Sequence, residues 1–374
     1  MNFVSMLKQQ SGQMGRNKAF LGTILCFITA VFCVFVAGCG NSGVSEESDA
    51  PVQEKSSDAK ISIGLSFDSF VIERWIRDRD VFTSTARELG ADVNVQNANG
   101  DVEEQISQIR YLIDKQVDVL VVVAADSMLL ADVMEEAHKS GIITISYDRL
   151  ILNTATDLYL SFDNRKVGTL MAKALKEAIT EGGDIFMIQG AAEDNNVDLV
   201  REGFDEEIKE SNLNVVYEAN CAGWLSELGA EYAREALELY PDVKGIMCGN
   251  DDIASSVIRV LAEKRLAGEV AVVGQDGDLA ACQRIVEGTQ TMTAFKPVEN
   301  LARAAAMYAV SMANGENPEE SELTGTMDYG SGKVDCILLE PISVQKSNMK
   351  KIIVDGGYHS MEDVYLNVKN SVVK

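Results

Sequence analysis

The sequence predicts an α/β protein made of two Rossmann-like lobes, each a parallel sheet with helices on both faces. Three observations support this prediction. Apolar strand-like runs alternate with helical stretches from Ile61 onward. Some runs, such as VDVLVVVAA at 117–125, are apolar throughout, as a strand covered on both faces must be. The alternation also comes in two series of similar size, which meet near 158–168 with no Pro-rich or Ser-rich linker between them.

The first series starts with a strand at 61–67 and a helix whose apolar stripe runs through Ile76, Phe82, Ala86 and Leu89. The helix is expected to stop at the glycine of ELGADV, because glycine readily takes the left-handed conformation that ends helices. The remaining elements expected here are a strand at 92–98, a helix around 106–113, the strand at 117–125, a helix ending at 138–141 and a strand at 142–148.

The second series starts near Gly183. Its expected strands are 184–190, 214–220, 243–249, 269–276 and 289–295, and its expected helices are 197–210, 226–239, 252–264 and 278–287. A long helical stretch at 299–315 is expected to return to the first lobe, so that the lobes are interleaved in sequence. The predicted boundaries are 60–162 plus 297–328 for the first lobe, 163–296 plus 329–360 for the second, and 361–374 for a tail.

The N-terminus has the pattern of a secretion signal. Lys8, Arg16 and Lys18 precede an apolar run at 19–36, which ends in the small residues of VAGC. This ending resembles a bacterial lipobox, which would make 1–38 a lipoprotein signal peptide and Cys39 the lipid-bearing first residue of an extracytoplasmic protein anchored to the cell membrane. A plain transmembrane anchor is the alternative, since about 18 apolar residues just span a bilayer. The Ser-rich, acidic stretch 39–59 is expected to be a flexible tether.

Composition and missing motifs exclude several kinds of function. The net charge of −25 argues against nucleic acid as a partner, because phosphates require basic protein surfaces. The chain has neither G-x-G-x-x-G after a strand nor a P-loop, and its two histidines, His138 and His359, suggest no catalytic triad or metal cluster, so no cofactor or metal is expected. Four cysteines lie after the tether, and they are expected either to form disulfides or to be buried thiols: Cys221, Cys248, Cys282 and Cys336.

Polar residues and both tryptophans follow the carboxyl ends of the predicted strands, where open parallel sheets bind ligands. They are Arg74, Trp75, Asp148, Arg149, Asn195, Asn196, Arg201, Trp224, Asn250, Asp251, Asp276 and Lys296. Charged donors and acceptors beside indole rings suit a sugar, whose hydroxyls donate and accept while its C–H faces are apolar. Taken singly, each residue also has an ordinary structural explanation: a surface ion pair, a helix N-cap at 250 or 251, or a core position for Trp224.

Several stretches resemble the periplasmic sugar-binding proteins of ABC transporters, most closely those for D-xylose: ERWIRDRDVF, VQNANG, SYDRLI, SFDNRKVG, DNNVDLVREG, GNDDIAS, GQDGDLA and GTQTMTAFKP. The resemblance implies the type I periplasmic binding protein fold, with two lobes, three crossovers and a hinge that closes over a monosaccharide. It implies sugar contacts from Arg74, Trp75, Asp148, Arg149, Asn196, Arg201, Trp224, Asn250, Asp276 and Lys296.

The resemblance therefore implies a lipid-anchored receptor, monomeric and not an enzyme, that delivers a pentose to an ABC transporter permease. A sugar sensor that passes its closed state to a membrane histidine kinase or chemoreceptor would use the same lobes. A secreted hydrolase with Asp148 and Asp276 as its acid pair is a third possibility, but neighbouring Arg and Lys residues would keep both carboxylates ionised, which is wrong for a general acid.

Overall fold

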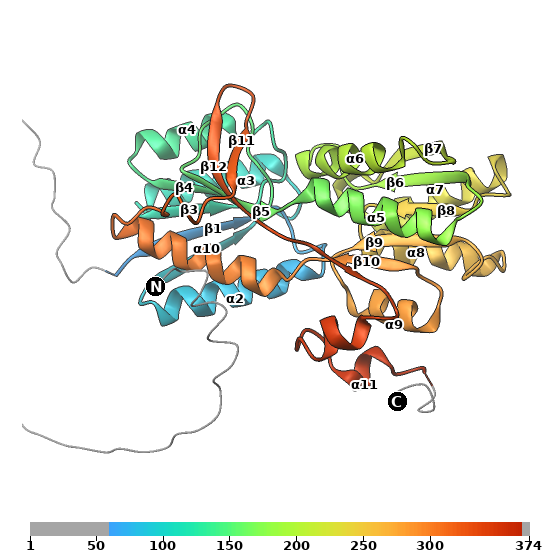
Figure 1. Cartoon of the computed structure of the whole chain (residues 1–374). Helices are drawn as coiled ribbons and strands as arrows, with labels where there is room; N and C mark the ends of the chain where they lie inside the picture. The colour runs from blue at the N-terminus through green and yellow to red at the C-terminus, as the bar shows by residue number, and fades with distance from the viewer. Residues whose placement is uncertain (1–59, 369–374) are drawn as a thin grey trace, which may run out of the picture. The chain divides into compact units, whose positions relative to one another are not determined.

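The computed structural model describes residues 60–368, and within them the strands form two sheets with helices on both faces of each (Figure 1). The predicted signal peptide at 1–38, the lipidation at Cys39 and the tether at 39–59 lie outside the described residues. So does the end of the predicted tail, 369–374.

The sheet of the first lobe contains seven strands among the described residues, in the spatial order β11-β12-β5-β4-β3-β1-β2. All neighbours pair in parallel except the hairpin of β11 and β12. The strands are β1 (Ser62–Phe67), β2 (Asp92–Asn97), β3 (Val119–Val122), β4 (Ile143–Tyr147), β5 (Leu158–Phe162), β11 (Gly325–Asp328) and β12 (Lys333–Leu339).

The sheet of the second lobe has six strands in the described part of the chain, in the order β13-β10-β9-β8-β6-β7. Only β13 runs antiparallel, against β10. The strands are β6 (Gly183–Gln189), β7 (Leu213–Asn220), β8 (Gly245–Cys248), β9 (Ala271–Gln275), β10 (Met292–Phe295) and β13 (Ile342–Val344). Five consecutive strands of each lobe therefore follow one doubly wound pattern, β2-β1-β3-β4-β5 and β7-β6-β8-β9-β10.

Helices cover both sheets. Those of the first lobe are α2 (Arg74–Glu88), α3 (Val102–Asp114), α4 (Ala131–Lys139) and α10 (Val298–Ala313). Those of the second are α5 (Asn164–Ala178), α6 (Asn195–Ile208), the short η1 (Ala222–Trp224), α7 (Ser226–Leu239), α8 (Asp251–Glu263), α9 (Leu279–Glu287), the π-helical turn η2 (Lys350–Val354) and α11 (Met361–Val364).

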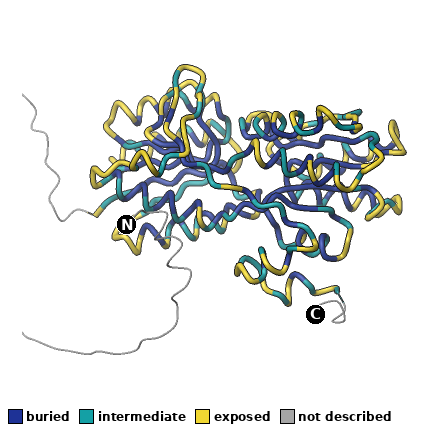
Figure 2. The backbone as a smooth tube through the Cα atoms, viewed as in Figure 1, coloured by how far each residue is buried: buried dark blue, intermediate teal, exposed yellow. Residues whose placement is uncertain are grey.

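Local chemistry explains where many of these helices begin. Asp101 caps α3 by accepting from the backbone N–H groups of Glu103 and Glu104, and Asp163, Asp194 and Asn250 cap α5, α6 and α8 in the same way. The apolar faces of the helices then pack on the strands, and the central strands of both sheets are buried (Figure 2). Strand β3 is fully buried, as its uninterrupted apolar sequence predicted.

The chain crosses between the lobes three times, after β5, after β10 and after β12. Helix α10 packs against α2, which confirms that the long helix after β10 returns to the first lobe. The predicted boundary after residue 328 is wrong, however, because β12 pairs with β5 and so completes the first sheet. Nor are residues 361–368 a loose tail: α11 packs on α9, and Val364 is buried in a cluster with Cys282 and Ile285.

Candidate functional site

The carboxyl ends of the strands of both lobes enclose one cavity. Its lining comes from strand ends, loops and helix starts at the carboxyl ends of β1, β4, β6, β7, β9 and β10, as expected for a site at the switch points of two doubly wound sheets. The lining residues are Ile72, Arg74, Trp75, Asp148, Arg149, Asp194, Asn196, Trp224, Gln275, Asp276 and Lys296.

Arg74 connects the two lobes through buried carboxylates. Its Nη2 donates to Asp148 Oδ2 at 2.8 Å, and its Nε and Nη2 donate to Asp78 at 3.3 and 3.2 Å. On the other side, its Nη1 lies 3.9 Å from Oδ1 of Asp276 in the second lobe. Tyr147 also donates to Asp78, so this carboxylate lies beneath the guanidinium and fixes its orientation.

Arg149 is held from both lobes as well. Its Nη1 donates to Asp68 Oδ2 at 2.7 Å and to the carbonyl oxygen of Ala124 at 2.8 Å, both in the first lobe. Its Nε lies 2.6 Å from Oδ2 of Asp194, at the start of α6 in the second lobe. Neither Nε nor Nη2 makes a hydrogen bond to a described residue, so the contact with Asp194 is an ion pair, and Nη2 has no partner among these residues. The guanidinium therefore keeps one N–H edge available in the cavity.

The two tryptophans come from different lobes and line the same cavity. Trp75 is 1% exposed and Trp224 is 7% exposed, and neither indole N–H has a partner among the described residues. The Arg74 guanidinium lies 4.3 Å from the centroid of the Trp75 ring, a cation–π contact. Gly190 allows Trp224 to lie close to the end of β6, because a Cβ there would be 2.2 Å from the ring.

The loop after β9 places Asp276 beside Lys296, whose Nζ lies 3.9 Å from Oδ1 of Asp276. Asp251, buried in α8, holds this loop by accepting from the backbone N–H groups of Gly277 at 2.9 Å and Asp278 at 3.1 Å. Asp276 is thus supported from behind by a second carboxylate that does not line the cavity.

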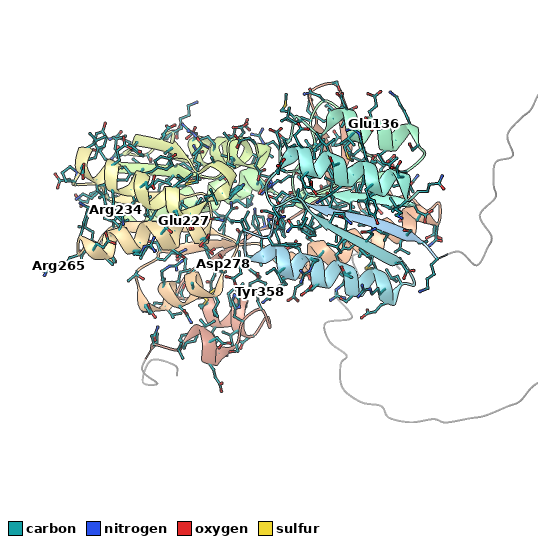
Figure 3. All side chains as sticks on the ribbon, turned by 180° about the vertical axis from the view of Figure 1, so that it is seen from behind. Glu136, Glu227, Arg234, Arg265, Asp278 and Tyr358 are labelled. Carbon is teal, nitrogen blue, oxygen red and sulfur yellow. The ribbon has the colours of Figure 1, made fainter. Side chains whose placement is uncertain are left out.

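The C-terminal segment supports the same loop from outside. His359 Nε2 donates to the Gly277 carbonyl oxygen at 2.9 Å, and the ring of Tyr358, labelled with Asp278 in Figure 3, packs on Phe295 with centroids 4.6 Å apart. Arg77 of α2 donates to the Tyr358 carbonyl oxygen at 3.0 Å, so the segment also contacts the first lobe.

Three residues that line the cavity have a strained backbone. Of the seven non-glycine residues with positive φ in the described part of the chain, three line the cavity: Asp148 at 63°, Trp224 at 60° and Asp276 at 101°. Such conformations cost roughly 1–3 kcal/mol each and persist where surrounding contacts enforce them, most often at functional sites.

Charge interactions keep the principal carboxylate of the site ionised. Burial raises the pKa of Asp148, but Arg74, Lys296 and Arg149 outweigh it and hold the pKa below its usual value. Burial dominates at Asp78 and Asp194, whose pKa values are raised although each faces a guanidinium. Asp148 is therefore a hydrogen-bond acceptor at neutral pH and is unsuited to be the general acid of a hydrolase.

The structure brings eight of the ten predicted contact residues to the cavity and leaves two away from it. Arg201 points to the surface, where it pairs with Asp205 at 2.6 Å and Glu218 at 2.7 Å. The Asn250 side chain caps α8 by accepting from the Ile253 N–H at 2.9 Å, which is its ordinary structural role. Sequence reasoning missed Ile72, Asp194 and Gln275, although the last directly precedes Asp276 at the end of β9.

Residues 60–368 contain neither a disulfide nor a cluster of metal-binding side chains. The four cysteines are free and buried, so the thiol alternative holds for the described chain. No cluster of His, Cys, Asp and Glu suited to a metal ion occurs in this range. None of the helices described here is both long and apolar enough to cross a membrane.

Comparisons with known proteins agree with the fold and with the kind of site. Residues 63–317 match the family model of the periplasmic binding protein domain. The D-xylose-binding periplasmic protein of Haemophilus influenzae is 41% identical over 310 residues, which cover 82% of this chain and 92% of that protein. The protein of the same name from Escherichia coli is 39% identical over 310 residues, with 82% and 93% covered.

The fold also matches solved structures. An ABC transporter solute binding protein from Clostridium phytofermentans, with bound β-D-glucose, aligns with a TM-score of 0.74 at 27% identity. The alignment covers 81% of this chain and 99% of that one.

Proposed function

The chain belongs to the family of periplasmic binding proteins, and we propose that it captures a neutral monosaccharide, D-xylose above all, between its two lobes. It is a binding protein and not an enzyme, like its relatives. The proposed contacts are Arg74, Trp75, Asp148, Arg149, Asn196, Trp224, Asp276 and Lys296, with Gln275 added from the cavity lining.

One observation carries the proposal: the cavity combines balanced charge with unused hydrogen-bonding groups. Its lining holds three basic side chains, those of Arg74, Arg149 and Lys296, and three acidic ones, those of Asp148, Asp194 and Asp276. A balanced lining favours a neutral ligand over an anion or a cation. Unpartnered polar atoms, such as the two indole N–H groups and Asp276 Oδ1, suit a ring that carries a hydroxyl on most of its carbons.

The choice of xylose rests on the two relatives that are about 40% identical and carry that sugar in their names. In this proposal the sugar enters between open lobes, and closure brings Trp75 and Trp224 onto it. The closed form then docks on an ABC transporter permease, because the ligand shifts the protein toward that state. We further propose that the protein acts as a monomer tethered outside the membrane by lipid on Cys39.

Isothermal titration calorimetry of the protein that begins at residue 40 tests the sugar. We expect D-xylose to bind in the micromolar to sub-micromolar range, about −8 to −10 kcal/mol, and more tightly than ribose, glucose or galactose. The absence of heat with all four sugars would reject the sugar proposal, and tighter binding of another sugar would reject xylose.

The lipid anchor has its own test. Cells expressing the full chain should incorporate an alkyne fatty acid into the wild type and not into Cys39→Ser. The wild-type protein should also partition into the detergent phase. Equal labelling of both proteins would contradict lipidation at Cys39, and membrane retention of both without labelling would favour the transmembrane-anchor alternative.

A further inference from the structure

The four residues 193–196, at the end of the β6–α6 loop and the start of α6, form a continuous set of contacts across the cleft. The carbonyl oxygen of Glu193 accepts from the Ser127 N–H at 3.1 Å, and Asn195 Oδ1 accepts from the Leu150 N–H at 3.2 Å. Between them, Asp194 pairs with Arg149. The fourth contact comes from Asn196, whose Nδ2 donates to the Asp148 carbonyl oxygen at 3.1 Å.

We propose that residues 193–196 are a latch that holds the lobes closed, and that Asp194 is the positioning residue within it. This inference rests on the proposed function and adds to it a group that controls sugar release. Each contact joins protein to protein, so all of them must break before the lobes can separate, whichever sugar lies in the cavity.

Asp194 is suited to this role because its two carboxylate oxygens have separate tasks. Oδ1 accepts from the Asn196 N–H at 3.0 Å and caps α6, so the carboxylate is fixed to the second lobe. Oδ2 reaches the Arg149 Nε at 2.6 Å. Both side chains are nearly fully buried, at 4% and 3% exposure, where an ion pair is little screened by solvent.

Arg149 would stay with the first lobe when the cleft opens, since Asp68 and the Ala124 carbonyl oxygen hold its Nη1. Closure therefore adds a third fixed contact to this guanidinium, at Nε. With both Nε and Nη1 held, the rotation of the guanidinium is restricted and its unpartnered Nη2 stays in the cavity. Asp194 thus acts on the sugar through Arg149, besides resisting opening.

This arrangement predicts a kinetic signature. The latch forms after the sugar has entered and breaks before it leaves, so its loss should raise the dissociation rate and leave the association rate nearly unchanged. Loss of a contact between two buried charged groups is expected to change an equilibrium constant by roughly 10- to 150-fold, as for a hydrogen bond to a charged group. We expect a change of about that size in the dissociation rate of D-xylose.

The experiment uses two variants of the protein that begins at residue 40, Asp194→Asn and Asp194→Ser. Asn and Ser are both good helix N-caps, so α6 should be retained while the negative charge is lost. The matched control is Asp101→Asn, which makes the same change at the N-cap of α3, where the capping carboxylate is exposed. Stopped-flow fluorescence measures both rate constants with D-xylose, and small-angle scattering measures the radius of gyration without sugar.

We expect both Asp194 variants to release D-xylose faster than the wild type and the control. Without sugar, they should have a larger radius of gyration, because the lobes open more often. Wild-type dissociation rates together with a wild-type radius of gyration would overturn the latch. If D-xylose does not bind the wild type, the sugar proposal fails while the scattering comparison still decides the latch: a larger radius supports it and an unchanged radius overturns it.

Discussion

Replacing Asp148 with Asn tests the buried charge network most directly. The substitution keeps the size of the side chain and removes its negative charge. Asp148 Oδ2 accepts from Arg74 at 2.8 Å, and Oδ1 accepts weakly from Asn196 at 3.3 Å. The carboxylate is 5% exposed, so water can replace little of what is lost.

The contacts that Arg74 keeps in the Asp148→Asn variant determine how much sugar binding should weaken. Arg74 keeps its two contacts with Asp78 and its 3.9 Å approach to Asp276, so the guanidinium is not left unpaired, and the larger cost of breaking a buried pair does not apply in full. A hydrogen bond to a charged group contributes about 1.5–3 kcal/mol, which corresponds to roughly 10- to 150-fold in the dissociation constant. We expect sugar binding to weaken by that factor and thermal stability to fall.

Calorimetry with D-xylose and thermal unfolding without sugar measure the two effects. Asp92→Asn is the control, because it removes an exposed carboxylate at the far end of β2. Because the pKa of Asp148 is lowered, its contribution to stability is present above the unfolded value near 3.8 and is lost only as the pH falls below it. An Asp148→Asn protein that binds within twofold of the wild type and unfolds at the same temperature would refute this reasoning.

Three further predictions concern positions around the site. Gly190→Ala should lower the free energy of unfolding by ~1–3 kcal/mol in urea denaturation and weaken sugar binding, because its Cβ overlaps the Trp224 ring; unchanged values would show that the ring moves freely. Arg201→Ala should keep the affinity for D-xylose, measured by calorimetry, within twofold of the wild type, because Arg201 pairs at the surface. A larger loss would show that Arg201 contributes to the site. Burial raises the pKa of Asp251 from 3.8 to about 7, so between these values the folded state holds a proton that the unfolded state has released. Urea denaturation from pH 5 to 8 should therefore show this contribution to stability falling as the pH rises through 7. A contribution that rises over this range would contradict the prediction.

Local pattern was sufficient for most of the fold. The apolar sequence of β3 predicted its burial, and the β-α alternation predicted that the strands run in parallel. The apolar stripe predicted for α2 is only half right, because Phe82 and Ala86 are buried while Ile76 and Leu89 are exposed. Strand β12 could not be placed in this way. It lies in the segment that returns to the first lobe after β10, and its partner β5 lies far away in sequence, so its sheet is decided by long-range pairing such as that of Cys336 with Tyr159.

The candidate site was likewise predictable where a residue directly follows a strand, and not where its position depends on helix rotation or on contacts between the lobes. Residues directly after a strand, such as Asp148 and Asp276, reach the cavity because the sheet fixes where each strand ends. Arg201 lies five residues beyond Asn196 within α6, and at 3.6 residues per turn it is rotated about 140° away from it. Asp194 was missed because an acidic residue before a helix usually serves as a cap alone, and its pairing with Arg149 depends on how the lobes meet.

The position of β12 also determines when the first lobe can be completed during biosynthesis. Its parallel neighbour β5 ends at Phe162, yet β12 is not synthesised until residue 339. A nascent chain must therefore keep one edge of that sheet unpaired while β6 to β10 of the second lobe are being made, and exposed strand edges promote aggregation. Chaperone demand should accordingly depend on how long the ribosome takes to reach the last crossover, and a circular permutant that begins after residue 313 should shorten that interval.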